Sequence, residues 1–278
     1  MDLYIFRHTR LRGGHNIDHD IPSGSLNMHI HSELEVIYII KGNLSIQAEG
    51  AIYHVGPGDL ILFRISEAHS ILRKTDTTIY DRVTFHIDPN LLKETLNGRL
   101  LKPFTDRPLG ISNHYSAGEL PQELIHACLE QIFGKQPMRN DMQALSYLLP
   151  ILQSIYDIYC QKQIVLPTEP TPLASRMIAY INAHLYELEG PHELEEQFFM
   201  SISQINRIFH AFTGSTVWNY VKLKRLHAAR EMLESGVAPM TAAARCGYQD
   251  YSSFFRAYKK QFGHPPKGDH SPKKKRLE

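Results

Sequence analysis

The last third of the chain contains one local pattern twice, at a separation of 49 residues. Each copy places an apolar residue, an Arg and an aromatic residue at positions i, i+2 and i+4, and a Gly follows five residues later. The matched residues are Ile205, Arg207, Phe209 and Gly214 in the first copy and Phe254, Arg256, Tyr258 and Gly263 in the second. In an α-helix, residues i and i+4 share a face while i+2 points away. The repeat therefore predicts two matched helices that each bury two side chains, present an Arg outward and end at a Gly.

The distribution of charge indicates what such helices could bind. The net charge is only +1, but residues 201–278 hold 14 Lys and Arg against 5 Asp and Glu, whereas residues 1–200 hold 16 against 24. A basic module joined to an acidic one favours nucleic acid as the partner of the basic end. Two helices with outward Arg and amide side chains suit the reading of adjacent stretches of a DNA groove.

Length and cysteine content limit the class of protein. A chain of 278 residues with 42% apolar residues is long enough for about two domains. Its three cysteines, Cys128, Cys160 and Cys246, are scattered and lack metal-binding spacing, which indicates a reducing compartment. The N-terminal residues lack the layout of a signal peptide, and the apolar run 36–40 is too short to span a bilayer. We therefore expect a soluble, cytoplasmic protein with no membrane partner.

Residue periodicity changes along the first 172 residues. Short β-branched segments separated by Gly and Pro turns run through residues 1–90, which is typical of a barrel or sandwich. Residues 119–162 then show helical periodicity. One stripe has gaps of 3 and 4 and suits either a helix pair or a dimer contact: Met142, Leu145, Leu149, Leu152, Tyr156 and Tyr159. The alternative is that these helices only cover the barrel. Pro167, Pro170 and Pro172 mark a linker.

Residues 173–267 resemble the DNA-binding domain of AraC-family transcription regulators, which pairs two helix-turn-helix units through one long helix. The residues that carry the resemblance are Ser201, Ile205, Arg207, Phe209, Gly214, Tyr220, Arg225, Ala229 and Leu233, then Ala244, Gly247, Tyr248, Phe254, Arg256, Tyr258, Lys259, Phe262, Gly263 and Pro266. Ser201 and Asp250 are natural N-caps, and Gly247 permits the left-handed conformation of a tight turn.

The resemblance implies that side chains early in each recognition helix read bases. Those predicted to do so are Ser203, Gln204, Asn206, Arg207, Gln249, Tyr251 and Ser252. Those predicted to contact phosphates are Lys222, Lys224, Arg256, Lys259 and Lys260.

One position departs from the family pattern. Glu195 stands where the first unit usually has a small Ala, and a buried Glu would cost several kcal/mol unless it is paired. Either the first unit is shifted relative to the family pattern at this position, or the unit is distorted. Because the acidic run 193–196 also repels phosphate, we expect the first unit to bind DNA more weakly than the second.

The N-terminal segment resembles a cupin barrel, the usual sensing domain of AraC-family regulators. The resemblance rests on Gly24, His29, His31, Glu35 and Gly42, with the turn 56–59 and His69. His29, His31 and Glu35 alternate onto one strand face, and His69 from a neighbouring strand could complete a site for a first-row divalent metal. We expect no cofactor, because sensing barrels of this family often keep such residues as pocket lining; a divalent metal is the alternative. The predicted ligand-binding residues are Arg7, His29, His31, Glu35, Tyr38, Arg64, His69 and Arg82.

These patterns together predict an α+β multidomain protein. The expected parts are a cupin-like ligand-sensing barrel (1–118), a helical dimerisation segment (119–165), a linker (166–172), an all-α double helix-turn-helix domain (173–267) and a basic disordered tail (268–278). The expected function is a sequence-specific DNA-binding transcription regulator, not an enzyme, that senses a small molecule and forms a homodimer on double-stranded DNA. The alternative is a metal-dependent cupin enzyme that carries a DNA-binding tail.

Overall fold

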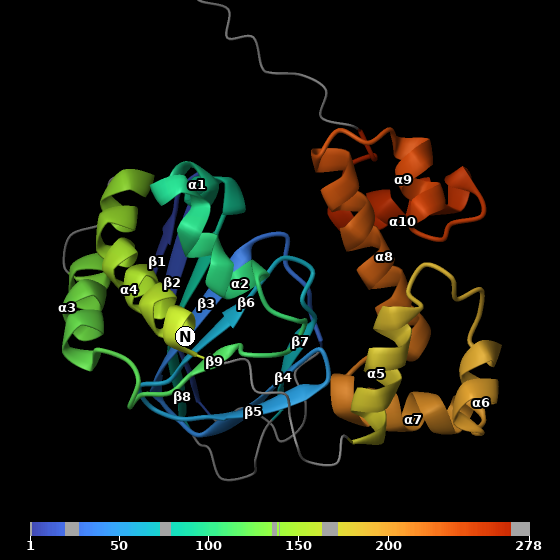
Figure 1. The fold of residues 1–278 in the computed structure, drawn as a ribbon, viewed down its shortest axis with the longest axis horizontal. Helices are drawn as coiled ribbons and strands as arrows, with labels where there is room; N and C mark the ends of the chain where they lie inside the picture. The colour runs from blue at the N-terminus through green and yellow to red at the C-terminus, as the bar shows by residue number, and fades with distance from the viewer. Residues whose placement is uncertain are drawn as a thin grey trace, which may run out of the picture. The chain divides into compact units, whose positions relative to one another are not determined.

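The computed structural model describes residues 2–19, 28–72, 79–134, 138, 140–162 and 172–267 (Figure 1). The chain divides into two compact units, residues 1–175 and 176–278. Most of the predicted linker and all of the predicted basic tail lie outside the described residues. None of the helices in the described ranges is long and apolar enough to cross a membrane.

The N-terminal unit is built on two antiparallel sheets. The larger sheet has the strand order β1-β2-β8-β3-β6-β9 and the smaller one β5-β4-β7. The strands are β1 (Asp2–Arg7), β2 (Leu11–His19), β3 (Leu34–Lys41), β4 (Leu44–Ala48), β5 (Ala51–Val55), β6 (Leu60–Phe63), β7 (His69–Leu72), β8 (Ile79–Ile87) and β9 (His114–Tyr115). The predicted β structure of this segment is therefore confirmed.

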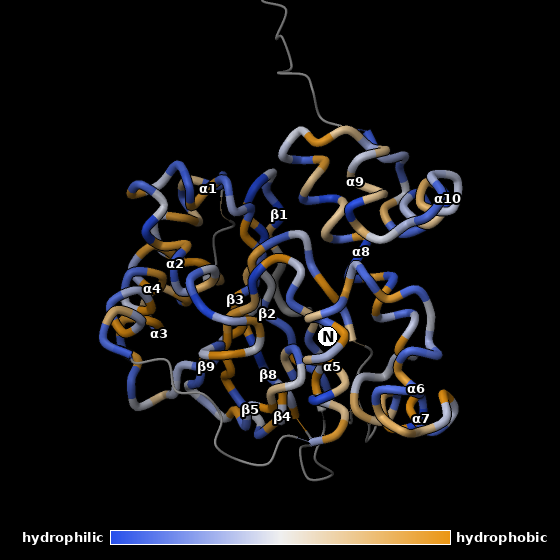
Figure 2. The backbone as a smooth tube through the Cα atoms, turned by 45° about the vertical axis from the view of Figure 1, so that its right-hand side comes forward, coloured by the Kyte–Doolittle hydropathy of each residue, from blue (hydrophilic) through white to orange (hydrophobic). Residues whose placement is uncertain are grey.

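Residues of β3 alternate between two cores because successive side chains of a strand point to opposite faces. Ile37 and Ile39 pack between the sheets with Ile46 and Phe63 of the smaller core. Leu34, Val36 and Tyr38 face a second core on the other side of the larger sheet. Figure 2 shows hydrophobic segments among the strands of this unit and helices of the same unit whose colouring alternates between hydrophobic and hydrophilic.

Helices cover the outer face of the larger sheet. They are α1 (Pro89–Glu94), the 3-10 helix η1 (Leu96–Leu101), α2 (Lys102–Thr105), α3 (Gln122–Phe133) and α4 (Asp141–Gln161). Leu145 and Leu152 of the predicted seam are buried in the same core as the sheet, whereas Met142 is 69% exposed. Part of the seam therefore serves the unit's own core.

The described part of the C-terminal unit has helices as its only regular elements, as predicted. Its helices are α5 (Leu173–Ala183), α6 (His192–Phe198), α7 (Ile202–Thr213), α8 (Val217–Glu234), α9 (Pro239–Arg245) and α10 (Tyr251–Phe262). We call α6 and α7 the first half and α9 and α10 the second half. At 1.5 Å per residue, the 18 residues of α8 span about 27 Å. Figure 1 shows α7 and α10 at opposite ends of α8.

Candidate functional site

The two recognition helices have the anchors and ends that the repeat predicts. Ile205 and Phe209 of α7, like Phe254 and Tyr258 of α10, are buried. The Ser201 hydroxyl accepts a hydrogen bond from the Gln204 backbone N–H, and the Asp250 carboxylate accepts one from the Ser253 N–H. Both helices end at a Gly in the left-handed conformation, Gly214 and Gly263. The anchors turn the opposite faces of α7 and α10 toward solvent.

Most of the side chains predicted to contact DNA are exposed, on α7, on α10 or close to them. Those that the structure places at the surface are Ser203, Gln204, Arg207, Lys222, Gln249, Tyr251, Ser252, Arg256, Lys259 and Lys260. The Gln204 side-chain oxygen also accepts a hydrogen bond from the Ser201 backbone N–H, so part of this side chain holds the start of α7.

Two predicted DNA contacts are differently placed. Lys224 is only 5% exposed, so the prediction that it reaches a phosphate is wrong for this conformation. The half-buried Asn206 accepts a hydrogen bond on Oδ1 from the Val217 backbone N–H at 3.0 Å, and so joins α7 to the start of α8. Its side chain supports the helix junction.

Glu195 is not the buried, unpaired charge that its position suggested. It is half-buried, and its carboxylate accepts a hydrogen bond from the Ile202 backbone N–H at 2.6 Å. A carboxylate at a helix N-terminus is favourable because the first N–H groups lack partners and carry partial positive charge. The first half is therefore intact, with a negative charge at the start of its recognition helix.

The N-terminal unit contains a cavity of about 360 Å³ that brings several predicted ligand-binding residues together. Its wall includes Arg7, His29, His31, Glu35 and Arg82. Tyr38 and Arg64, which were also predicted to bind the ligand, do not line this cavity. The Tyr38 hydroxyl lies 2.6 Å from Gln122 Oε1 on the helix-covered side of the sheet, and Arg64 donates to the backbone carbonyl of Thr105.

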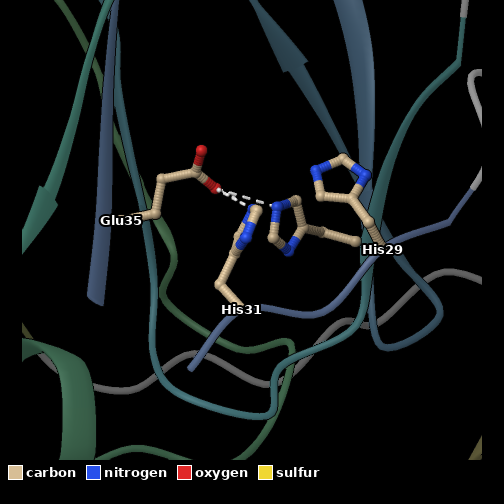
Figure 3. A group of neighbouring side chains, drawn as sticks. His29, His31 and Glu35 are labelled. Carbon is tan, nitrogen blue, oxygen red and sulfur yellow. Dashed lines mark ion pairs between the residues drawn. The ribbon is translucent and has the colours of Figure 1, made fainter. Parts of the chain in front are cut away.

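Four of the predicted ligand-binding residues form a cluster that could hold a cation. One ligand atom from each of His29, His31, Glu35 and His69 lies within 4.8 Å of the others. Glu35 Oε2 lies 2.9 Å from His69 Nε2 and 3.4 Å from His31 Nε2. Among the described residues, none of these three atoms has a partner with hydrogen-bond geometry. Figure 3 shows the Glu35 carboxylate directed at the His31 side, with His29 on the far side of the group. Three imidazoles and a carboxylate suit a first-row divalent metal.

Burial and neighbouring rings set the ionisation of this cluster. Burial alone would raise the pKa of Glu35, but His31 and His69 outweigh it and hold that pKa well below its usual value. Burial would lower the pKa of His69, yet the adjacent Glu35 carboxylate raises it. The cluster therefore favours an ionised carboxylate.

The orientation of His69 depends on groups outside the cavity. Its Nδ1 lies 2.9 Å from the Glu67 carbonyl oxygen, which can only accept, so Nδ1 carries the proton and Nε2 faces Glu35. Glu67 in turn forms a buried ion pair with Arg107 at 2.7 Å. The His69 ring stacks on Phe63 with centroids 3.7 Å apart. This support keeps Nε2 directed at the cluster.

Two features of the cluster differ from the sequence prediction. His29 and His31 do not share a strand with Glu35: His29 forms an isolated bridge with His69, and a bend at residues 32–33 precedes β3. His86, which was not predicted, also borders the cavity, with Nε2 3.7 Å from Glu35 Oε1. It is the cross-strand partner of Glu35, and only the pairing of β3 with β8 reveals that.

Comparison with known proteins finds a match for each of the two units. Residues 19–154 match the family model of an AraC-like ligand binding domain, and residues 194–268 match that of a helix-turn-helix domain. The HTH-type transcriptional regulator YbfI of Bacillus subtilis is 24% identical over 229 residues, which cover 81% of this chain and 79% of that protein. The HTH-type transcriptional activator RhaS of Escherichia coli is 28% identical over 261 residues, 90% of each chain. A solved structure of ToxT from Vibrio cholerae aligns with a TM-score of 0.41 and 11% identity, over 93% of this chain and 97% of that one.

Proposed function

Because this chain belongs to the AraC family of transcription regulators, with a ligand-binding domain followed by a helix-turn-helix DNA-binding domain, we propose that α7 and α10 read two neighbouring segments of one DNA site. The observation that carries this proposal is the pair of matched helices, each anchored on one face and exposed on the other, at the two ends of α8. Major-groove segments on one face of B-DNA recur about every 34 Å.

We assign the contacts by exposure and chemistry. Arg207 of α7 and Gln249 at the start of α10 reach toward bases, because Arg pairs with guanine and Gln with adenine in two-bonded arrangements. Arg256, Lys259 and Lys260, exposed along α10, contact phosphates. Phosphate contacts make binding fall steeply as salt rises.

The test begins with selection of sites from random double-stranded DNA by the full-length chain, followed by gel shifts at fixed salt. Arg207→Ala should weaken binding to the selected site by about 5- to 150-fold and relax the base preference at one position. Lys260→Ala should weaken binding to all sequences alike and lower the salt slope by about one. Arg99→Ala, an exposed charge of the other unit, is the control. Unchanged specific affinity in Arg207→Ala and Arg256→Ala would refute the assignment.

For the N-terminal unit we propose that the two sheets close into a cupin-like barrel whose cavity binds a small polar effector, a sugar or other metabolite. Its wall offers guanidinium, imidazole and carboxylate groups, which suit hydroxyl or carboxylate groups on a ligand. The effector must prefer one arrangement of the two domains, because equal binding to both shifts nothing. The predicted linker at 166–172 is where that preference would be transmitted.

A thermal-shift screen of sugars, sugar acids and small carboxylates against the full chain tests this cavity. A true effector should raise the melting temperature of the wild type, and the rise should disappear in His31→Ala and Arg7→Gln. Tyr38→Phe and Arg64→Gln are matched controls outside the cavity wall and should keep the response. If all four variants lost the rise in melting temperature equally, the proposal that the effector binds in this cavity would be contradicted.

We further propose that the regulator acts as a homodimer in the cytoplasm. The outer side of α4 is the surface that we propose as the dimer interface. Met142 is exposed there, and Leu149 and Tyr156 are only partly buried. Analytical ultracentrifugation of Met142→Glu against the wild type tests this surface. A dimer that persists unchanged would place the interface elsewhere.

A second candidate function rests on the ligand cluster. We propose that His29, His31, Glu35 and His69 can hold a divalent cation, which would act as a Lewis acid or as an anchor for the effector. Metal analysis after addition of manganese or iron should find one equivalent that is lost in His31→Ala and kept in His54→Ala, a histidine bonded to Ser45. Equal metal content in both variants would contradict the site. Tightly held metal together with turnover would favour the cupin enzyme instead.

A further inference from the structure

The two halves of the DNA-binding domain meet at the middle of α8. Helices α7 and α5 hold the start of this helix: Asn206 of α7 accepts from the Val217 N–H, and the Tyr220 hydroxyl donates to Asn182 Oδ1 of α5. The second half packs on the end of the helix, where Leu226 and Leu233 share a core with α9 and α10. The packing therefore changes from one half to the other near residue 225.

Arg225 lies at this change and is only 5% exposed. Its Nε donates to the Leu185 carbonyl at 2.7 Å, one terminal nitrogen donates to the Leu188 carbonyl at 2.5 Å, and the other donates to the Gly247 carbonyl at 3.1 Å. Leu185 and Leu188 belong to the loop between α5 and α6, whereas Gly247 is in the turn of the second half. One buried guanidinium thus bonds the main chain of the α5–α6 loop and that of the turn in the second half.

The α5–α6 loop is itself fixed to the first half. The Glu193 carboxylate on α6 accepts hydrogen bonds from the backbone N–H groups of Glu189 and Gly190, at 2.5 Å and 3.1 Å. A continuous series of hydrogen bonds therefore runs from α6 through this loop to Arg225 and on to the turn before α10.

Gly247 is independent evidence that the turn of the second half packs closely on the α5–α6 loop. A Cβ at this position would lie 2.5 Å from the Tyr186 carbonyl oxygen and 2.9 Å from Arg225 Cζ. Since real Cβ contacts are not this short, only Gly lets the turn approach the α5–α6 loop so closely. Its φ of +77° also favours Gly.

We infer that Arg225 is a specificity-determining positioning residue that fixes the spacing and angle between α7 and α10, and so the number of base pairs between the two half-sites. The inference rests on the proposed reading of a two-part DNA site. Insertion of one base pair moves a half-site by about 3.4 Å and turns it by about 35°. A joint held by three directed hydrogen bonds cannot follow that change without losing contacts. Lys cannot replace the fork, because its single ammonium lacks the planar geometry that reaches three carbonyls.

The experiment compares full-length wild type with Arg225→Lys on four DNAs: the selected site, the site with one base pair inserted or deleted between its halves, and the second half-site alone. The wild type should lose about tenfold or more in affinity when the spacing changes. Arg225→Lys should bind the native spacing more weakly, but its spacing penalty should shrink to about threefold or less, with half-site affinity unchanged. Gly247→Ala should reduce the spacing penalty similarly. Arg230→Lys, at a half-buried Arg on the same helix that pairs with Glu234, should leave the penalty unchanged.

Each outcome decides a separate claim. A wild type that selects no two-part site refutes the proposed function. A wild type with a sharp spacing preference that Arg225→Lys retains refutes the role of Arg225. Loss of half-site affinity in Arg225→Lys also refutes it, because the residue would then only support the second half; melting temperatures of both proteins identify this case.

Discussion

The first and second halves of the DNA-binding domain bury the same kind of anchors but begin their recognition helices differently. Ser201 and Gln204 cap α7 reciprocally, and Glu195 adds a carboxylate on the Ile202 N–H. Asp250 caps α10, and the preceding helix α9 contains no acidic residue. The left-handed residue after the first helix is Phe199 in one half and Gly247 in the other. The buried anchors give α7 and α10 the same packing. The residues before each helix differ, and they set the charge that each half presents to DNA.

The difference bears on which half binds DNA more strongly. Phosphates are repelled by carboxylates, and α6 carries Glu193, Glu195 and Glu196 before its recognition helix, whereas α9 ends in Arg245. We propose that α10 supplies the larger part of DNA affinity and α7 the smaller part.

The largest expected effect is the loss of stability when the buried ring of either recognition helix is removed, and it tests whether the two halves are anchored alike. Phe209→Ala and Phe254→Ala each remove a fully buried ring, and each should lower the free energy of unfolding of its half by about 3–5 kcal/mol. Hydrogen exchange of α7 and α10 amides measures the two halves separately. Phe255→Ala, which changes an exposed neighbour, should stay within about 0.5 kcal/mol of the wild type. A cost below about 1 kcal/mol for Phe254→Ala would mean that α10 is not held by this ring.

Substitutions at the two left-handed residues, Gly247 and Phe199, should change the free energy of unfolding in opposite directions. Gly247→Ala adds a Cβ where the Tyr186 carbonyl lies too close, and it should lower the free energy of unfolding by about 1–3 kcal/mol. Phe199 is 94% exposed, so Phe199→Gly loses little packing, relieves a strained φ, and should be neutral or stabilising by up to about 1 kcal/mol. Urea titration of the two variants gives the signs directly. If both variants changed the free energy of unfolding in the same direction, the two left-handed residues would not distinguish the halves.

Glu195→Gln sharpens the electrostatic side of the comparison. The amide can still accept from the Ile202 N–H, but the charge is gone, so DNA affinity at low salt should rise about 2- to 5-fold. Glu196→Gln on the same helix makes the same charge change away from the α7 terminus and should raise affinity less. The gain should disappear at high salt, where such charges are screened. Lower affinity in Glu195→Gln would show that its charge supports rather than weakens the first half.

The smallest effect concerns pH, because one cap titrates and the other does not. Hydrogen bonds from the Ser253 side chain and backbone lower the pKa of Asp250. Its ionised form therefore stabilises α10 above the unfolded pKa of about 3.9, and this contribution is lost as pH falls through the lower folded pKa. Asp250→Ser installs the cap type of α7 and should remove this part of the acid dependence. Hydrogen exchange of α10 between pH 6 and pH 3 measures it; parallel curves for both proteins would contradict the assignment.

Helical and strand periods alone predicted much of this molecule. The anchors, caps and glycine ends of α7 and α10 follow from the repeat. The same reasoning would have placed Lys224 on the buried face, since it comes seven residues after Val217 and four after Tyr220, yet we predicted it to contact phosphate. Strand alternation would likewise have put Tyr38, three residues after Glu35, on the opposite side of β3.

Other features depend on tertiary contacts that no local pattern encodes. His86 joins the cavity only because β8 pairs with β3 in one register. Glu195 is tolerated because the turn carries its carboxylate to the Ile202 N–H. Arg225 needs three carbonyls from two loops that are distant in the sequence. Such long-range partners are why the joint between the halves could not be predicted.

Hydroxyl-radical footprinting of the full chain on its selected DNA tests the central claim most directly. We predict two protected segments on one face of the duplex, about one helical turn or 10 base pairs apart. Arg207→Ala should weaken protection of one segment, and Arg256→Ala should weaken protection of the other. A single protected segment, or loss of the same segment in both variants, would contradict the reading of one site by two matched helices.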